Sequence, residues 1–292
     1  MNKILFLLAL AALCCEASAQ HKQSGATVPG RHNTVVRRKQ IDTANLRILY
    51  AWNADDIKQD STYLDLGQLL IGKKMTKYCS LFVEQADDER VKWHKANPRA
   101  QSVPNGTWWM RGKRPDVWSE YQYSDIFIHG DTLNEWAMMP LGQEWPLRYE
   151  EKIQPQGWRL GTERKTILGH VCQKATCHWR GRDYVAWFAA DIPIRRGPWK
   201  FGGLPGLILK IYDTAHLYTF EAVGIEKGTF PIWQYPKEEY KKSTRRQTWK
   251  LQVAFNRNYL LTSGRRKYDP NAPGGMGDPM SAPHPYDPME LE

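Results

Sequence analysis

The segment from Tyr184 to Asp213 constrains the fold most, because its two apolar runs are separated by a crossing rich in proline and glycine. Proline fixes φ and removes a backbone donor, whereas glycine adopts positive φ without a steric cost. Within the crossing, Leu204-Pro205-Gly206-Leu207 has proline and glycine where a type II turn requires them. We therefore expect two strands joined by a tightly bent connection. The special residues of the crossing are Pro193, Gly197, Pro198, Gly202, Gly203, Pro205 and Gly206.

The crossing also contains a sequence motif, Gly203-Leu204-Pro205-Gly206-Leu207-Ile208. Together with Ile192-Pro193-Ile194 and with Gly169-x-x-Cys172-Gln173-Lys174-Ala175-Thr176, it resembles the GLPGLI family of secreted Bacteroidetes proteins. Residues Pro285 to Leu291 resemble the usual ending of that family. The resemblance implies an exported protein, and it implies no reaction because the biochemical activity of the family is unassigned.

The motif residues themselves admit two interpretations. The favoured one is a structural turn whose leucines pack inward, since proline and glycine are ordinary turn residues. In the alternative, the consecutive amides of Gly202 and Gly203 form a nest that binds a small anion. The chain has neither a P-loop nor a dinucleotide-binding glycine spacing, so we expect no nucleotide and no cofactor.

The sequence predicts four parts. Residues 1–19 form a signal peptide, because Lys3 precedes an apolar run and Ala17-Ser18-Ala19 is a small-residue cleavage site. Residues 20–40 form a basic flexible lead, residues 41–262 a single β-rich domain, and residues 263–292 a tail rich in proline, glycine and methionine. The apolar run is too short to span a bilayer. We therefore expect an exported protein of the periplasm or cell surface that does not span the membrane.

The fold class expected for the domain is mainly β, an antiparallel curved open sheet or partial barrel with one or two helices. Leu46, Ile48, Tyr50 and Trp52 alternate with other residues at the period of a strand. The polar segment 55–68 indicates a turn or short helix, 77–83 a strand, and 87–96 a helix. Residues 158–226 contain consecutive strands with short turns, which is typical of an antiparallel meander. Residues 236–261 have a helical period.

Charge and aromatic content indicate possible partners. The formal net charge is +10, and the chain has 13 tryptophans and 14 tyrosines. Basic runs bind nucleic acid or anionic head groups; because an exported protein rarely meets nucleic acid, an anionic envelope component is favoured. A solvated surface is the simpler alternative. Aromatic strands can line a binding concavity, although most such rings are expected in the core.

A catalytic hypothesis rests on the hairpin that joins residues 167–179 to 184–192. A two-residue Gly181-Arg182 loop of type II′ would pair Trp179 with Tyr184. That register places Cys172 opposite Asp191, with His170 two residues away on the same face. His, Cys and Asp together could form a nucleophile with its base, or three zinc ligands. Cysteine is also often buried for packing alone, and the resemblance implies an aromatic residue at the position of His170.

The tail suggests a metal site or a docking segment. Thioether and imidazole groups are ligands for copper(I), whereas residues 285–291 could instead dock as an extended peptide. Cys79, Cys172 and Cys177 remain after export, an odd number that leaves at least one thiol without an intramolecular partner. The copper candidates are Met276, Met280, His284 and Met289.

These patterns lead to one preferred function and two alternatives. The preferred function is non-catalytic binding of a ligand or an envelope protein through an aromatic-rich sheet. The first alternative is a hydrolase using Cys172, His170 and Asp191, and the second is handling of copper or zinc.

Overall fold

The computed structural model describes residues 37–99, 124–139, 142–257 and 286–292, with side chains described outside residues 138–145. The predicted signal peptide and most of the basic lead lie outside this part of the chain. So do the metal candidates Met276, Met280 and His284.

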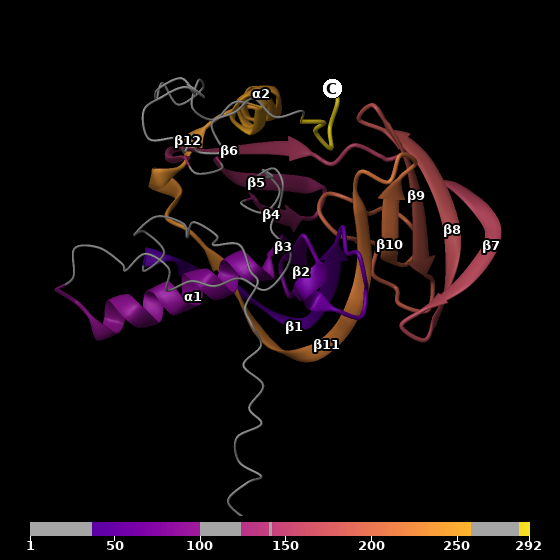
Figure 1. The fold of residues 1–292 in the computed structure, drawn as a ribbon, viewed down its shortest axis with the longest axis horizontal. Helices are drawn as coiled ribbons and strands as arrows, with labels where there is room; N and C mark the ends of the chain where they lie inside the picture. The colour runs from indigo at the N-terminus through magenta and orange to yellow at the C-terminus, as the bar shows by residue number, and fades with distance from the viewer. Residues whose placement is uncertain (1–36, 100–123, 140–141, 258–285) are drawn as a thin grey trace, which may run out of the picture.

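A single open sheet of twelve strands forms the body of the molecule (Figure 1). Its strand order is β12-β6-β5-β4-β3-β2-β1-β11-β10-β9-β8-β7, and every pair is antiparallel except β12–β6. The mainly antiparallel open sheet with two helices confirms the predicted fold class. The strands are β1 (Lys39–Trp52), β2 (Asp65–Gly72), β3 (Thr76–Ser80), β4 (Ser124–His129), β5 (Thr132–Met139), β6 (Gly142–Lys152), β7 (Arg159–Ile167), β8 (His170–Trp179), β9 (Arg182–Ala189), β10 (Leu207–Asp213), β11 (Thr219–Gln234) and β12 (Lys241–Lys242).

The long pair β1–β11 lies at the centre of the sheet and sets its curvature. In β1 the predicted alternation places Ile48, Tyr50 and Trp52 in the core. The pair changes register at three places, and such bulges bend a strand and increase its twist. Strands β7–β10 therefore turn away from the strands on the other side of β1, as Figure 1 shows.

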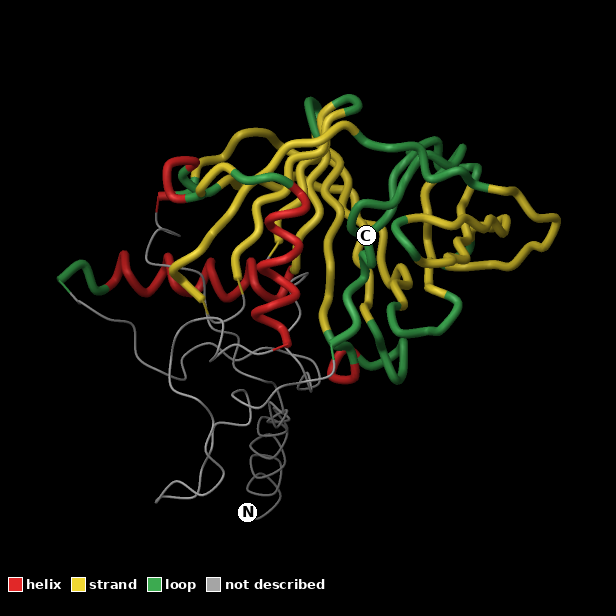
Figure 2. The backbone as a smooth tube through the Cα atoms, turned by 90° about the horizontal axis from the view of Figure 1, so that it is seen from above, coloured by secondary structure: helices red, strands yellow, loops and turns green. Residues whose placement is uncertain are grey.

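Two helices cover the half of the sheet that contains β2–β6 (Figure 2). Helix α1 (Leu81–Ala96) contacts β2 and β3, and α2 (Arg245–Arg257) contacts β5 and β6. Phe255 of α2 is buried against Ala137. No helix within the described ranges is long and apolar enough to cross a membrane.

The C-terminal segment 286–292 docks on the hairpin β8–β9, as predicted for an extended peptide. The amide of Leu291 donates to the carbonyl oxygen of Arg180 at 3.0 Å. The hydroxyl of Tyr184 donates to the carbonyl oxygen of Met289 at 3.0 Å. The Met289 side chain is fully buried in the main core cluster, so this end of the chain is part of the folded domain.

Candidate functional site

The hairpin β8–β9 turns one residue earlier than the sequence predicts. Arg180 and Gly181 are the loop residues, with φ of 50° and 80°, which suits a type I′ turn. Trp179 therefore pairs with Arg182, and Cys172 with Ala189 instead of Asp191. An arginine tolerates this conformation here because its guanidinium is held by Glu151 and Glu290. The expected type II′ turn and its register are wrong.

The changed register separates the three candidate catalytic residues. The Nδ1 of His170 lies 2.6 Å from the Oδ2 of Asp191 at the surface, and this hydrogen bond lowers the pKa of Asp191. The Cys172 side chain is fully buried, and its thiol donates to the backbone carbonyl oxygen of His170. Burial raises the pKa of Cys172 to about 11. The structure thus pairs His170 with Asp191 and leaves an uncharged thiol in the core.

The motif segment confirms one part of the sequence interpretation and corrects another. Leu204, Leu207 and Ile208 are buried, as expected for a turn whose apolar side chains pack inward. The positive φ, +86°, occurs at Gly203 and not at Gly206, so the predicted type II turn is wrong. Gly206 is required by a close approach instead, because a Cβ there would lie 2.1 Å from the carbonyl oxygen of Ala189.

The amides proposed as an anion nest already have acceptors within the protein. The amide of Gly202 donates to the Oε1 of Gln156 at 3.1 Å. The amide of Gly203 donates to the carbonyl oxygen of Arg195 at 3.2 Å. A bound anion would have to displace both acceptors, so this alternative does not fit the geometry.

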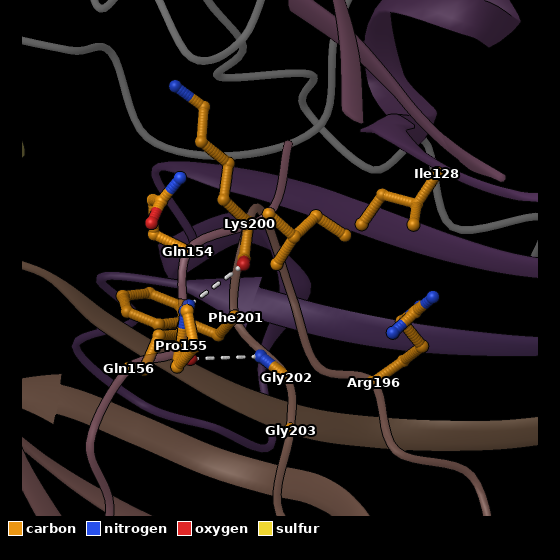
Figure 3. A pocket seen from close by; sticks show the side chains of 10 residues that line it. Ile128, Gln154, Pro155, Gln156, Arg196, Lys200, Phe201, Gly202 and Gly203 are labelled. Carbon is orange, nitrogen blue, oxygen red and sulfur yellow. Dashed lines mark hydrogen bonds between the residues drawn. The ribbon is translucent and has the colours of Figure 1, made fainter. Parts of the chain in front are cut away.

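A pocket lies beside the motif, where the connection from β6 to β7 meets the crossing between β9 and β10 (Figure 3). We call it the motif pocket. It encloses about 380 Å³ of empty space, including its open mouth. Figure 3 shows Ile128 and Arg196 on one side and Pro155 and Gln156 on the other. The lining residues are Ile128, Ile153, Gln154, Pro155, Gln156, Arg196, Lys200, Phe201, Gly202 and Gly203.

Gln156 fixes the shape of the motif pocket. Its side chain is buried and bonds the crossing twice: its amide nitrogen donates to the carbonyl oxygen of Lys200 at 3.0 Å, and its amide oxygen accepts from Gly202. Both bonds are drawn in Figure 3. The indole of Trp158 donates to the carbonyl oxygen of Gly202 at 2.8 Å. The pocket wall is therefore held in place before any ligand arrives.

The amine of Lys200 points away from the motif pocket into a buried ionic network (Figure 3). It lies 2.7 Å from the Oε2 of Glu135 and 2.5 Å from the Oε1 of Glu290. The hydroxyl of Tyr149 donates to Glu135 at 2.6 Å. Burial, followed by the charge of Glu135, raises the pKa of Tyr149 well above its usual value. The network joins β5, β6, the motif crossing and the C-terminal segment, which gives Lys200 a structural role.

The aromatic side chains mostly pack inside the protein. Trp52, Trp136, Trp179 and Trp199 are buried. The other tryptophans with described side chains are half-buried, and two of them carry a cation on one face: Trp187 with Lys165 and Trp233 with Arg38. This distribution favours the core interpretation over an aromatic binding surface. The half-buried tryptophans are Trp93, Trp158, Trp187, Trp233 and Trp249.

The described residues give no support to the metal hypothesis. No group of three or more histidine, cysteine and acidic residues that could hold an ion occurs among them. Cys79, Cys172 and Cys177 are free thiols in the interior. Met289, the one copper candidate within the described chain, lies in the core.

The sequence pattern singled out Gly202 and Gly203 of the motif pocket but not its other lining residues. Gln156 and Arg196 stand in polar or basic contexts typical of solvent-exposed loops. The one available signal was the doublet Arg195-Arg196 inside an otherwise apolar, glycine-rich stretch, which is an unusual place for two cations.

Comparison with known proteins finds a short sequence similarity that includes part of this site. A family model described as a protein of unknown function (Porph_ging) matches residues 179–210. The match begins at the end of β8 and includes the crossing and the motif. No curated protein matches the sequence.

Among solved structures, the chain is similar to PNGF-II in its C2 and P21 crystal forms. The identities are 15% and 14%, with TM-scores of 0.43 and 0.44. The similarity covers 74% of this chain but 33% and 34% of the PNGF-II chain in the two forms. The present chain therefore spans about a third of the length of PNGF-II.

Proposed function

We propose that this protein is an exported cell-envelope protein of the GLPGLI type that binds a ligand or an envelope partner without catalysing a reaction on it. We place the binding site in the motif pocket. The observation that carries the proposal is that the crossing between β9 and β10, which provides half of the pocket lining, is fixed by two hydrogen bonds from the buried side chain of Gln156.

The lining of the motif pocket supports binding. Ile128, Ile153, Pro155 and Phe201 provide apolar contact area, and Gln154 and Arg196 provide hydrogen-bond donors. Ligand sites in proteins usually combine an apolar wall with a few such polar groups. The site is a pocket between the β6–β7 connection and the β9–β10 crossing, and its one aromatic lining residue, Phe201, packs against Trp179, Tyr184 and Trp199 of the core.

Binding can be tested with an uncharged apolar fluorophore such as 1-aminoanthracene, titrated into the full chain. We expect saturable binding of one equivalent. Gln154→Trp should weaken it at least ~10-fold, because an indole at this exposed position fills the mouth of the pocket. Gln59→Trp is the matched control, since Gln59 is equally exposed and lies outside the pocket lining. Absence of saturable binding, or equal affinity in the Gln154→Trp variant, would refute the proposal.

Export rests on the sequence of residues 1–19 and has its own test. We expect the full chain to be recovered from the periplasm or cell surface when produced in a bacterium with a Sec pathway. Deletion of residues 2–19 should retain it in the cytoplasm. Equal distribution of the two proteins would contradict export.

A further inference from the structure

Arg196 is a cation of the motif pocket that lacks a counter-ion. One terminal nitrogen donates to the carbonyl oxygen of Gly130 and the other to that of Arg195, each at 3.2 Å. Its Nε is buried and has no hydrogen-bond partner. A guanidinium has five N–H donors, so each terminal nitrogen keeps a second N–H.

The surroundings of Arg196 leave its charge uncompensated. No carboxylate of the described chain lies within salt-bridge distance of it. The carboxylate of Asp131, which follows Gly130 in the sequence, is exposed and lies 3.8 Å from the amine of Lys152. Burial, followed by the charge of Arg195, lowers the pKa of Arg196. Placing a cation in such surroundings is costly unless an anion joins it.

The other cation of the pocket lining is already neutralised. The amine of Lys200 contacts Glu135 and Glu290 and points away from the pocket. The motif pocket therefore offers one free positive charge beside an apolar wall formed by Ile128, Ile153, Pro155 and Phe201.

We infer that the motif pocket binds a small amphipathic carboxylic acid, with its carboxylate on the terminal nitrogens of Arg196 and its apolar body against Ile128 and Phe201. This inference rests on the proposed function and adds the chemical class of the ligand. A carboxylate fits because its single charge matches one guanidinium and its two oxygens match the planar donor fork.

The experiment compares decanoate, decanol and decyl phosphate by calorimetric titration of the full chain. Displacement of 1-aminoanthracene confirms that all three occupy the same pocket. We expect decanoate to bind ~10- to 100-fold more tightly than decanol, the range given by a charge-assisted hydrogen bond. Decyl phosphate should bind no better than decanoate, because its second negative charge has no partner.

Variants of Arg196 test whether this residue is responsible. Arg196→Gln should reduce the preference for decanoate over decanol, measured as the ratio of the two affinities within the same variant, to about one. Arg196→Lys should retain part of the preference, since it keeps the charge and loses the fork. Arg164→Gln is the control, because Arg164 lies on β7 outside the pocket lining and also donates to backbone carbonyls.

Three outcomes would overturn the inference: equal affinity for decanoate and decanol, a preference that survives Arg196→Gln, or tighter binding of decyl phosphate. If one of these outcomes occurs while 1-aminoanthracene still binds to the wild type, the inference fails but the proposed function is still supported. If none of the compounds binds, both the inference and the proposed function fail.

Discussion

Glu290 is the residue on which the buried ionic network converges. Its carboxylate lies 2.5 Å from the amine of Lys200 and 2.9 Å from Arg245, and it also pairs with Arg180. Burial opposes the charged form of Glu290, but these cations overcome it, so that its pKa falls from 4.5 to about 2. One carboxylate near the end of the chain thus compensates cations from two loops and a helix.

Glu290→Gln should lower the free energy of unfolding by about 3 kcal/mol at pH 7, because it leaves buried cations without their counter-charge. The pKa of Glu290 is lower in the folded state, so its contribution is complete above pH 4.5 and is lost as the pH falls toward 2. Urea denaturation between pH 2 and pH 4.5 should show that the free energy of unfolding of the wild type rises with pH more steeply than that of the variant. Glu292→Gln, at an exposed position, should match the wild type; a similar loss there would contradict the assignment.

Asp65 has the opposite pH dependence. It is buried, accepts a hydrogen bond from Ser80 at 2.7 Å, and has a pKa raised by burial to about 7. Between pH 4 and 7 the unfolded chain loses this proton while the folded protein keeps it, so the free energy of unfolding decreases as pH rises. Asp65→Asn should be more stable than the wild type by about 4 kcal/mol at pH 8 and equal to it at pH 3. A constant difference across this range would contradict the prediction.

At the scale of elements, the crossing from β9 to β10 depends on close backbone contact. A Cβ at Gly206 would meet the backbone of Ala189, whereas a Cβ at Gly169 would meet nothing within 4 Å. Gly169→Ala should cost about 1–2 kcal/mol through its positive φ alone. Gly206→Ala should lower the free energy of unfolding clearly more than Gly169→Ala does, because the backbone around Ala189 must move to accept the new Cβ. It should also weaken binding of 1-aminoanthracene. Equal thermal midpoints of the two variants would contradict this account.

Local sequence patterns predicted the elements well where one face of a strand is buried. The alternation in β1 and the meander β7–β11 are examples. The turn or short helix expected at 55–68 is confirmed by the 3-10 helix Asp60–Thr62, but the end of that segment, from Asp65, belongs to β2. β2 lies inside the sheet, and its burial on both faces leaves little alternation from which to predict a strand. The strand expected at 77–83 ends already at Ser80. The Ser80 hydroxyl accepts a hydrogen bond from the amide of Val83 and caps the N-terminus of α1, so residues 81–83 are helical instead of extended.

Contacts between residues far apart in the chain could not be predicted, because local sequence patterns contain no information about them. The turn at Arg180-Gly181 follows from the contacts of Arg180 with Glu151 and Glu290, which no local rule contains. The motif pocket likewise joins Gln156 to the crossing across 46 residues. The motif was recognisable as a bent connection, whereas its role as a pocket wall required the folded chain.

At the scale of the molecule, the C-terminal segment completes the domain. Arg182 donates to the carbonyl oxygen of Pro288 at 2.6 Å, and the indole of Trp249 donates to that of Glu290 at 2.8 Å. Met289 fills the core beside these contacts. The segment therefore contributes both apolar burial and charge compensation.

Ending the chain at Pro285 should lower the free energy of unfolding by at least ~3 kcal/mol, because burial of Met289 and the charge of Glu290 are both lost. A synthetic peptide of residues 286–292 should restore the thermal midpoint in a concentration-dependent manner. The same peptide with Glu290→Gln should restore much less. A truncated chain as stable as the full one would show that the segment is dispensable.

The most direct test of the account is a crystal structure of the full chain grown with decanoate. We expect the alkyl chain to lie between Ile128 and Phe201 in the motif pocket, with the carboxylate within hydrogen-bond distance of Arg196. An empty motif pocket with decanoate bound at another surface would contradict it.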